Sequence, residues 1–173
     1  MTRSITVLFS LLASGALFAQ SQQAIRDQIF GETDVVKKQA EDLNSKVLAP
    51  GSYADGMEVY LSAVDTMEKG KDLDSVREDL AEAKGFFQKS IDASQLARTT
   101  FSVSLEARAA AEKAESAKYA ARDWERAEEA LMSAAATLEG GNLNKATKDA
   151  GDALERYRET ETKAIAAKAR AAQ

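Results

Sequence analysis

The sequence contains no cysteine and no histidine among its 173 residues. It therefore lacks the commonest metal ligand, the usual general base and the strongest nucleophile that side chains offer at neutral pH. Without cysteine, the fold cannot depend on disulfide bonds. We therefore expect a protein that is not an enzyme, with no catalytic residue, no cofactor and no metal site.

Proline is nearly absent too: Pro50 is the single one. No long stretch alternates polar and apolar residues, whereas apolar residues recur at spacings of three and four among Ala, Glu, Lys, Arg and Leu, the best helix formers. The fold class is therefore predicted to be all-α. We expect helices over about 22–48, with a possible interruption near Gly31, and over about 53–69, 73–120, 123–139 and 143–169. The long third helix is expected to bend near Thr99, Thr100 and Val103.

The chain contains an internal repeat. The segment 40–70 recurs about 71 positions later as 111–141, with about ten of roughly 31 positions identical. After Gly70 and Gly141 the register shifts by one residue, so that Phe87 falls on Tyr157. Such a repeat predicts a duplicated antiparallel helical hairpin unit, in which each unit buries its apolar face against a neighbour. We expect an elongated helical bundle, coiled-coil-like in its packing, or a short solenoid.

The predicted organisation is a signal peptide over residues 1–19 and a single all-helical domain over 20–173. The domain contains two repeats, about 40–105 and 111–173. The first helix of each repeat is expected to end at a break, at 49–52 in the first repeat and at 120–123 in the second. Ser52 and Asp123 would act as N-caps of the helices that follow these breaks. After the glycine turns, the expected N-caps are Asp72 or Asp74 in the first repeat and Asn142 or Asn144 in the second.

The N-terminus has the three-part layout of a secretory signal peptide. Arg3 supplies a basic start, the run Ile5 to Leu12 is apolar, and Ala19 precedes a polar stretch. An uncleaved N-terminal anchor is the alternative interpretation. No cysteine follows the apolar run, so a lipid anchor on cysteine is not expected. We predict an exported, soluble periplasmic protein with no membrane span after cleavage.

Charge of both signs is interspersed along the chain, with a net charge of −5. This balance argues against nucleic-acid binding and against docking on an anionic membrane, because both need a basic face. Nearly every carboxylate has a Lys or Arg three or four residues away, as Glu125 has Arg122. That pattern is typical of solvated helix faces, so paired carboxylates are not expected to hydrolyse glycosidic bonds.

Few aromatic residues are present, and they fall on the apolar stripes. The candidate partner or ligand surface consists of Tyr53, Tyr60, Phe87, Trp124 and Tyr157. Two interpretations remain open for them: they anchor the packing of neighbouring helices, or they line a groove for a glycan or peptide. Two alanine-rich surfaces, over 107–121 and 164–172, likewise fit either close packing within the chain or a seam for a partner.

The repeated pattern resembles an uncharacterised Ala-rich helical domain of Gram-negative envelope proteins. This domain is often found in lipoproteins or ahead of an OmpA-like domain, and it is tetratricopeptide-like in character. The resemblance covers roughly 40–163. It is carried by Ala49-Pro50, Tyr53, Tyr60, Ala63, Gly70-Lys71-Asp72-Leu73, Trp124, Ala127, Ala134, Gly141-Asn142-Leu143, Ala146, Ala150 and Ala153. The resemblance implies an envelope location and no catalytic residues.

We therefore expect a non-catalytic periplasmic helical-repeat protein that acts as a scaffold or adaptor for protein–protein interaction in the bacterial cell envelope. Its partner would be an envelope protein or a second copy of the chain. The alternative is a ligand-binding module that holds a glycan, such as a peptidoglycan fragment, or a small solute in an aromatic groove.

Overall fold

The computed structural model describes residues 10–70 and 72–173, and for residues 10–23 it describes the backbone alone. Within these residues the chain forms eight α-helices and no strand, which confirms the predicted all-α class. Of the predicted signal peptide, residues 1–9 lie outside the described residues. The backbone of residues 10–19 forms the start of the first helix.

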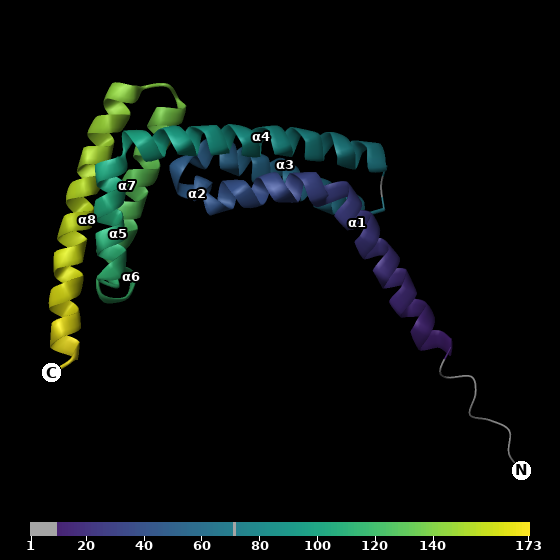
Figure 1. Ribbon diagram of the computed structural model, residues 1–173, viewed down its shortest axis with the longest axis horizontal. Helices are drawn as coiled ribbons and strands as arrows, with labels where there is room; N and C mark the ends of the chain where they lie inside the picture. Colours follow the sequence, from purple (N-terminus) through teal and green to yellow (C-terminus); the bar gives the residue numbers. More distant parts are fainter. Residues whose placement is uncertain (1–9, 71) are drawn as a thin grey trace, which may run out of the picture.

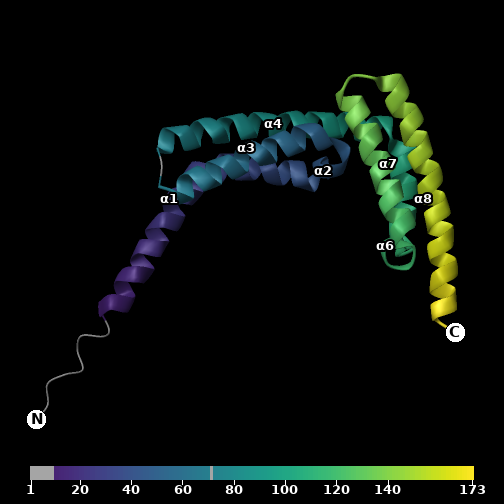
Figure 2. The same ribbon diagram turned by 180° about the vertical axis from the view of Figure 1, so that it is seen from behind.

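The eight helices divide into two four-helix units. Unit 1 contains α1 (Ser10–Asp42), α2 (Ser45–Leu48), α3 (Pro50–Glu68) and α4 (Leu73–Thr100). Unit 2 contains α5 (Ser102–Lys113), α6 (Ser116–Tyr119), α7 (Ala121–Glu139) and α8 (Leu143–Ala171). The units form two arms that meet at an elbow where α4 passes into α5 (Figure 1). Seen from behind, the N-terminal part of α1 again runs out from the first arm (Figure 2).

The two units repeat the same backbone path. Ser45 and Ser116 begin α2 and α6, 71 positions apart, and α3 and α7 have the same offset and the same length. Each unit places a left-handed residue after its first helix: Asn44 has φ 60° and Glu115 has φ 59°. Glycines with positive φ, Gly70 and Gly141, follow α3 and α7. The helices after them begin 70 positions apart, which confirms the predicted shift of register by one residue.

Two predicted helices run across breaks that the structure shows, and the first also begins earlier than predicted, at Ser10. The first helix does not continue to Leu48, because the left-handed Asn44 ends the α-helical path and a short α2 follows. It is uninterrupted at Gly31. The predicted helix over 73–120 is broken at Phe101, beside Thr99 and Thr100 as expected, and again at Glu115. Both threonine hydroxyls donate to carbonyls four residues back, an arrangement that bends helices.

Helix capping follows the prediction at the starts of α4 and α8 but not at the starts of α3 and α7. Asp72 accepts a hydrogen bond from the amide of Asp74, and Asn142 accepts one from the amide of Lys145, as expected of N-caps. The predictions for Ser52 and Asp123 were wrong. Helices α3 and α7 begin before these residues, at Pro50 and Ala121, and neither helix has an N-cap side chain of its own.

Each unit has its own hydrophobic core, and the second core also includes residues from the first unit. The first core contains Phe30, Tyr60, Val76, Leu80, Phe87 and Ile91. The second is built around Leu131, Leu138, Tyr157 and buried alanines, and it takes in Leu48, Ala97 and Phe101. Residues from α2, from the end of α4 and from the elbow therefore complete the core of unit 2, and this shared packing holds the two arms together.

Candidate interaction surface

The predicted aromatic residues of unit 1 form a cluster in its interior. The rings of Tyr53 and Tyr60 lie 5.8 Å and 6.3 Å from the ring of Phe87, and Phe30 contacts Tyr60 edge-on at 5.6 Å. Phe30, Phe87 and Tyr60 are buried, and Tyr53 is partly exposed. These side chains therefore pack α1 and α3 onto α4.

The predicted aromatic residues of unit 2 form a second, smaller cluster. Trp124 contacts Tyr157 with ring centroids 5.7 Å apart, as Tyr53 contacts Phe87 at the equivalent place in unit 1. Tyr157 is fully buried, and Trp124 is partly exposed. The structure thus places the five predicted residues in two separate clusters, one in each unit.

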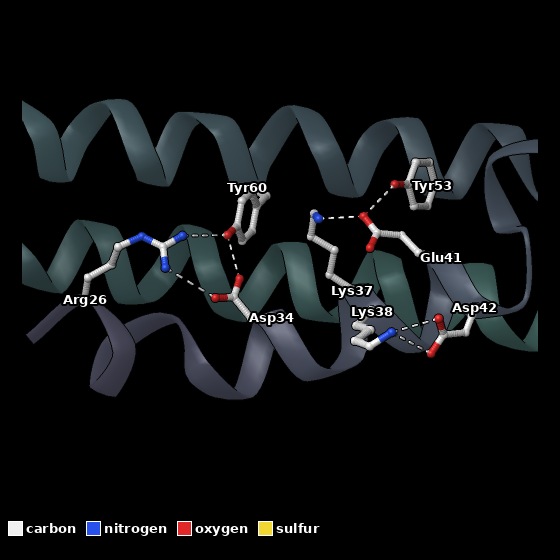
Figure 3. Close-up of polar contacts among 8 residues, drawn as sticks. All are labelled: Arg26, Asp34, Lys37, Lys38, Glu41, Asp42, Tyr53 and Tyr60. Atoms are coloured by element: carbon white, nitrogen blue, oxygen red, sulfur yellow. Dashed lines mark hydrogen bonds and ion pairs between the residues drawn. The ribbon is translucent and has the colours of Figure 1, made fainter. Parts of the chain in front are cut away.

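Polar groups surround the tyrosine hydroxyl of unit 1 (Figure 3). Tyr60 on α3 donates a hydrogen bond of 2.5 Å to Asp34 on α1 and accepts one of 3.2 Å from Arg26. The guanidinium of Arg26 also pairs with Asp34 at 3.5 Å. Burial, followed by the hydrogen bond to the Asp34 carboxylate, raises the pKa of Tyr60 to about 12. The phenol therefore stays protonated, and its hydrogen bond to Asp34 connects α3 to α1.

A second group of contacts lies farther along α1. Lys37 pairs with Glu41 at 2.6 Å, and Glu41 also accepts a hydrogen bond from the Tyr53 hydroxyl at 3.3 Å (Figure 3). Burial, and then the charge of Glu41, raises the pKa of Tyr53. The neighbouring pair of Lys38 and Asp42 is exposed and lies along one face of α1. Such surface pairs contribute little to stability.

Unit 2 builds a comparable network from other positions. Tyr157 on α8 donates to Glu128 on α7 at 2.5 Å, and Arg108 on α5 contacts both oxygens of that carboxylate at 2.7 Å and 3.0 Å. The Arg108 guanidinium also lies 5.4 Å from the centre of the Trp124 ring. Burial, and then Glu128, raises the pKa of Tyr157. Here too a neutral phenol joins helices by donating to a carboxylate.

Several large aliphatic residues are exposed, and four of them form two repeat-related pairs. Ile25 is 46% exposed and its equivalent Leu96 53%, while Leu73 is 39% exposed and its equivalent Leu143 53%. Leu73 and Leu143 continue the apolar spacing of their helices in the sequence, but the structure leaves both exposed. Both are the first residues of their helices, where the preceding turn leaves them uncovered. We call Ile25 with Leu73, and Leu96 with Leu143, the repeated aliphatic pairs.

In unit 1 the repeated aliphatic pair borders a groove between α1 and α4 of about 570 Å³. Its apolar lining consists of Ile25, Ile29, Leu73, Leu80 and Ala81. Charged residues also line the groove: Lys84 on α4 forms an ion pair of 2.7 Å with Glu32 on α1. The Lys84 ammonium lowers the pKa of Glu32. The groove therefore combines an aliphatic surface with charges of both signs.

Two equivalent hydrogen bonds show that the two units bring their helices together in the same way. The Thr33 hydroxyl donates to the Leu80 carbonyl at 3.2 Å, and in unit 2 the Ser104 hydroxyl donates to the Ala150 carbonyl at 2.7 Å. Both hydroxyls are buried. In the sequence, the hydrophobic period of one repeat does not single out the repeated aliphatic pairs. A comparison of equivalent positions in the two repeats would have drawn attention to them.

The alanine-rich surfaces of α5 and α8 are divided between interior and exterior. Ala107, Ala111 and Ala164 are buried in the packing of unit 2. Others, among them Ala110, Ala114, Ala169 and Ala172, line an open groove of about 580 Å³ together with Ile165. Close packing within the chain thus accounts for one part of these surfaces, and the rest faces outward.

No protein-family model matches this chain, and comparisons with curated proteins and with solved structures return no match either. In the described part of the chain, no three His, Cys, Asp or Glu side chains are grouped so that they would hold a metal ion. Among the same residues, no helix has both the length and the apolar character needed to cross a bilayer.

Proposed function

We propose that this protein is a non-catalytic scaffold or adaptor of the bacterial cell envelope, and that it binds an amphipathic helix of another envelope protein at each of its repeated aliphatic pairs. The observation that carries the proposal is the retention of exposed aliphatic side chains at both equivalent places. About two thirds of the positions differ between the aligned segments 40–70 and 111–141. The four residues of the repeated pairs lie outside these segments, and each equivalent position keeps an aliphatic side chain although that side chain is exposed.

The shape of the groove in unit 1 supports a helical partner. A groove between two helices with an aliphatic lining accepts the apolar stripe of a third helix, whose residues recur at spacings of three and four. Lys84, Glu32 and Arg77 would meet the polar flanks of such a helix with charges of both signs. Because the second pair repeats the first, one chain would hold two similar helices, as an adaptor requires.

The location in the envelope rests on the N-terminal sequence. Arg3, the apolar run that follows it and Ala19 support export to the periplasm by a signal peptide. Cell fractionation and sequencing of the N-terminus of the purified protein test this part. A chain that begins near Gln20 in the periplasmic fraction is expected, and an intact N-terminus in the cytosol would contradict it.

Site-specific photocrosslinking in cells tests the scaffold proposal. A photoreactive amino acid replaces Leu73 or Leu143 of the full-length chain, and the controls are Val35 and Leu61, which are 57% and 56% exposed and do not belong to the repeated pairs. We expect the same protein to be crosslinked from Leu73 and from Leu143, and much less from the control positions.

The identified partner then allows a second measurement. The double variant Leu73→Lys with Leu143→Lys should lose co-purification of that protein, and the matched variant Val35→Lys with Leu61→Lys should keep it. Crosslinking only to a second copy of the chain would replace the envelope partner by self-association. Equal crosslinking at all four positions, or at none, would overturn the proposal.

A further inference from the structure

The covalent connection between the two units is short. Phe101, with φ −107° and ψ 22°, is the one residue between the α-helical segments α4 and α5. Its ring is buried in the core of unit 2. Rotation about the backbone bonds of such a residue would swing one arm relative to the other, because no continuous helix spans the elbow.

Apolar packing between the units is limited to a few side chains. Leu48 on the four-residue α2 is buried in the same cluster as Leu131 and Leu138 on α7, and Val47 packs against that cluster. Apolar contacts favour association but have no preferred direction. This packing therefore holds the arms together without determining by itself the angle between them.

One directional contact joins the arms outside this packing. The carboxylate of Glu139, the last residue of α7, accepts hydrogen bonds from the amides of Gly51 at 2.8 Å and Ser52 at 3.1 Å. Both amides lie in the first turn of α3, where the helix dipole favours a negative charge. Charge-assisted contacts made by both oxygens of one carboxylate restrict orientation as well as distance.

The contact depends on a glycine. A Cβ atom on Gly51 would lie 3.2 Å from the Oε2 atom of Glu139, closer than an ordinary van der Waals contact. The equivalent residue of unit 2 is Arg122, and the residue equivalent to Glu139 is Glu68. Glu68 is exposed and makes no hydrogen bond or ion pair within the described residues. The same backbone thus occurs twice, but the contact forms once, at the joint between the units.

We propose that the contact of Glu139 with the start of α3 is a clamp that fixes the elbow, and that the two arms rotate about Phe101 when the clamp is removed. This inference is independent of the proposed scaffold function, because neither Glu139 nor Gly51 belongs to the repeated aliphatic pairs. The clamp would keep the two pairs at a constant distance and orientation in the free protein.

Distance measurement between two spin labels tests the clamp. Since the chain has no cysteine, Glu78→Cys on α4 and Glu155→Cys on α8 allow one label to be attached to each arm of the full chain. Both positions are exposed and make no ion pair in the described residues. Double electron–electron resonance on this protein should give a single narrow distance distribution.

Glu139→Ala should cause the loss of this narrow maximum in favour of a broad distribution, while far-UV circular dichroism shows that the helices remain. Gly51→Ala, which keeps the carboxylate but displaces it, should also broaden the distribution. Glu68→Ala is the matched control and should leave it unchanged. A narrow and unshifted distribution in a folded Glu139→Ala protein, or equal broadening in Glu68→Ala, would overturn the proposal.

Discussion

Unit 1 and unit 2 reach the same backbone with different interiors. Both use a left-handed residue, a short helix and a glycine turn at equivalent positions. Unit 1 fills its core with Phe30, Tyr60, Phe87 and Ile91, whereas buried alanines make up much of the core of unit 2. The difference teaches that the turns and the helical period specify this fold, while the side chains that fill it can be exchanged.

The largest expected effect concerns whether the units fold as one. Phe87→Ala removes a fully buried ring from unit 1 and should lower the free energy of unfolding by about 3–5 kcal/mol. Because Leu48, Ala97 and Phe101 help to form the core of unit 2, we expect the unfolding of unit 2 to shift as well. Urea titration followed by Trp124 fluorescence reports on unit 2, and circular dichroism reports on both units. An unshifted Trp124 transition would show that the units unfold independently.

The next effect concerns a close contact that differs between the units. A Cβ on Gly56 would lie 2.9 Å from the ring of Phe87, whereas the equivalent residue in unit 2 is the buried Ala127. Gly56→Ala should therefore destabilise the protein by about 1–3 kcal/mol through overpacking, even though alanine favours helices. Thermal unfolding measures the change. A gain in stability would show that Phe87 moves aside without cost.

A smaller effect concerns two equivalent buried serines. Ser45 accepts a hydrogen bond from Ser94 at 2.8 Å, but the residue equivalent to Ser94 in unit 2 is Ala164, and the Ser116 hydroxyl has no partner within the described residues. Ser45→Ala should cost about 1 kcal/mol, whereas Ser116→Ala should be neutral or stabilising, because it removes an unsatisfied hydroxyl.

The substitution Ala164→Ser sharpens the comparison of the serines. It should restore the missing hydrogen bond of Ser116 and raise the free energy of unfolding measured in urea. If Ser45→Ala and Ser116→Ala cost the same, the two hydroxyls would be in equivalent environments after all.

The smallest expected effect is the loss of the stability that Tyr60 contributes, and this loss occurs only at high pH. The pKa of Tyr60 is raised to about 12 in the folded protein, above its ordinary value of 10.0, by burial and by its hydrogen bond to Asp34. The stability that this phenol contributes is therefore complete below its unfolded pKa and is lost as the pH rises through about 12. Unfolding measured across this range should show a smaller loss for Tyr60→Phe than for the parent. An equal loss would mean that Tyr60 contributes no part of it.

The sequence predicted the parts of the fold that depend on neighbours along the chain. The helical class, the repeat and the bend beside Thr99 and Thr100 follow from local propensity and period. So do the alternatives Asp72 or Asp74 and Asn142 or Asn144 for the caps, of which the structure uses Asp72 and Asn142. The short helices α2 and α6 were missed, because a left-handed Asn44 or Glu115 carries no reliable signal in a helix-favouring sequence. For the candidate surface, the sequence singled out five aromatic residues, of which the structure buries Tyr60, Phe87 and Tyr157. It did not indicate the repeated aliphatic pairs, because period alone does not reveal which residues a neighbouring helix leaves uncovered.

By itself, the sequence determined that this protein is a duplicated all-α chain with no cysteine and no histidine. Only the tertiary structure decided how the two units meet, because that depends on groups far apart in the chain. Glu139 and Gly51 are separated by 88 positions, and nothing in the local sequence of either residue indicates the other. Their contact exists because the packing of α2 and α4 against unit 2 brings the end of α7 to the start of α3.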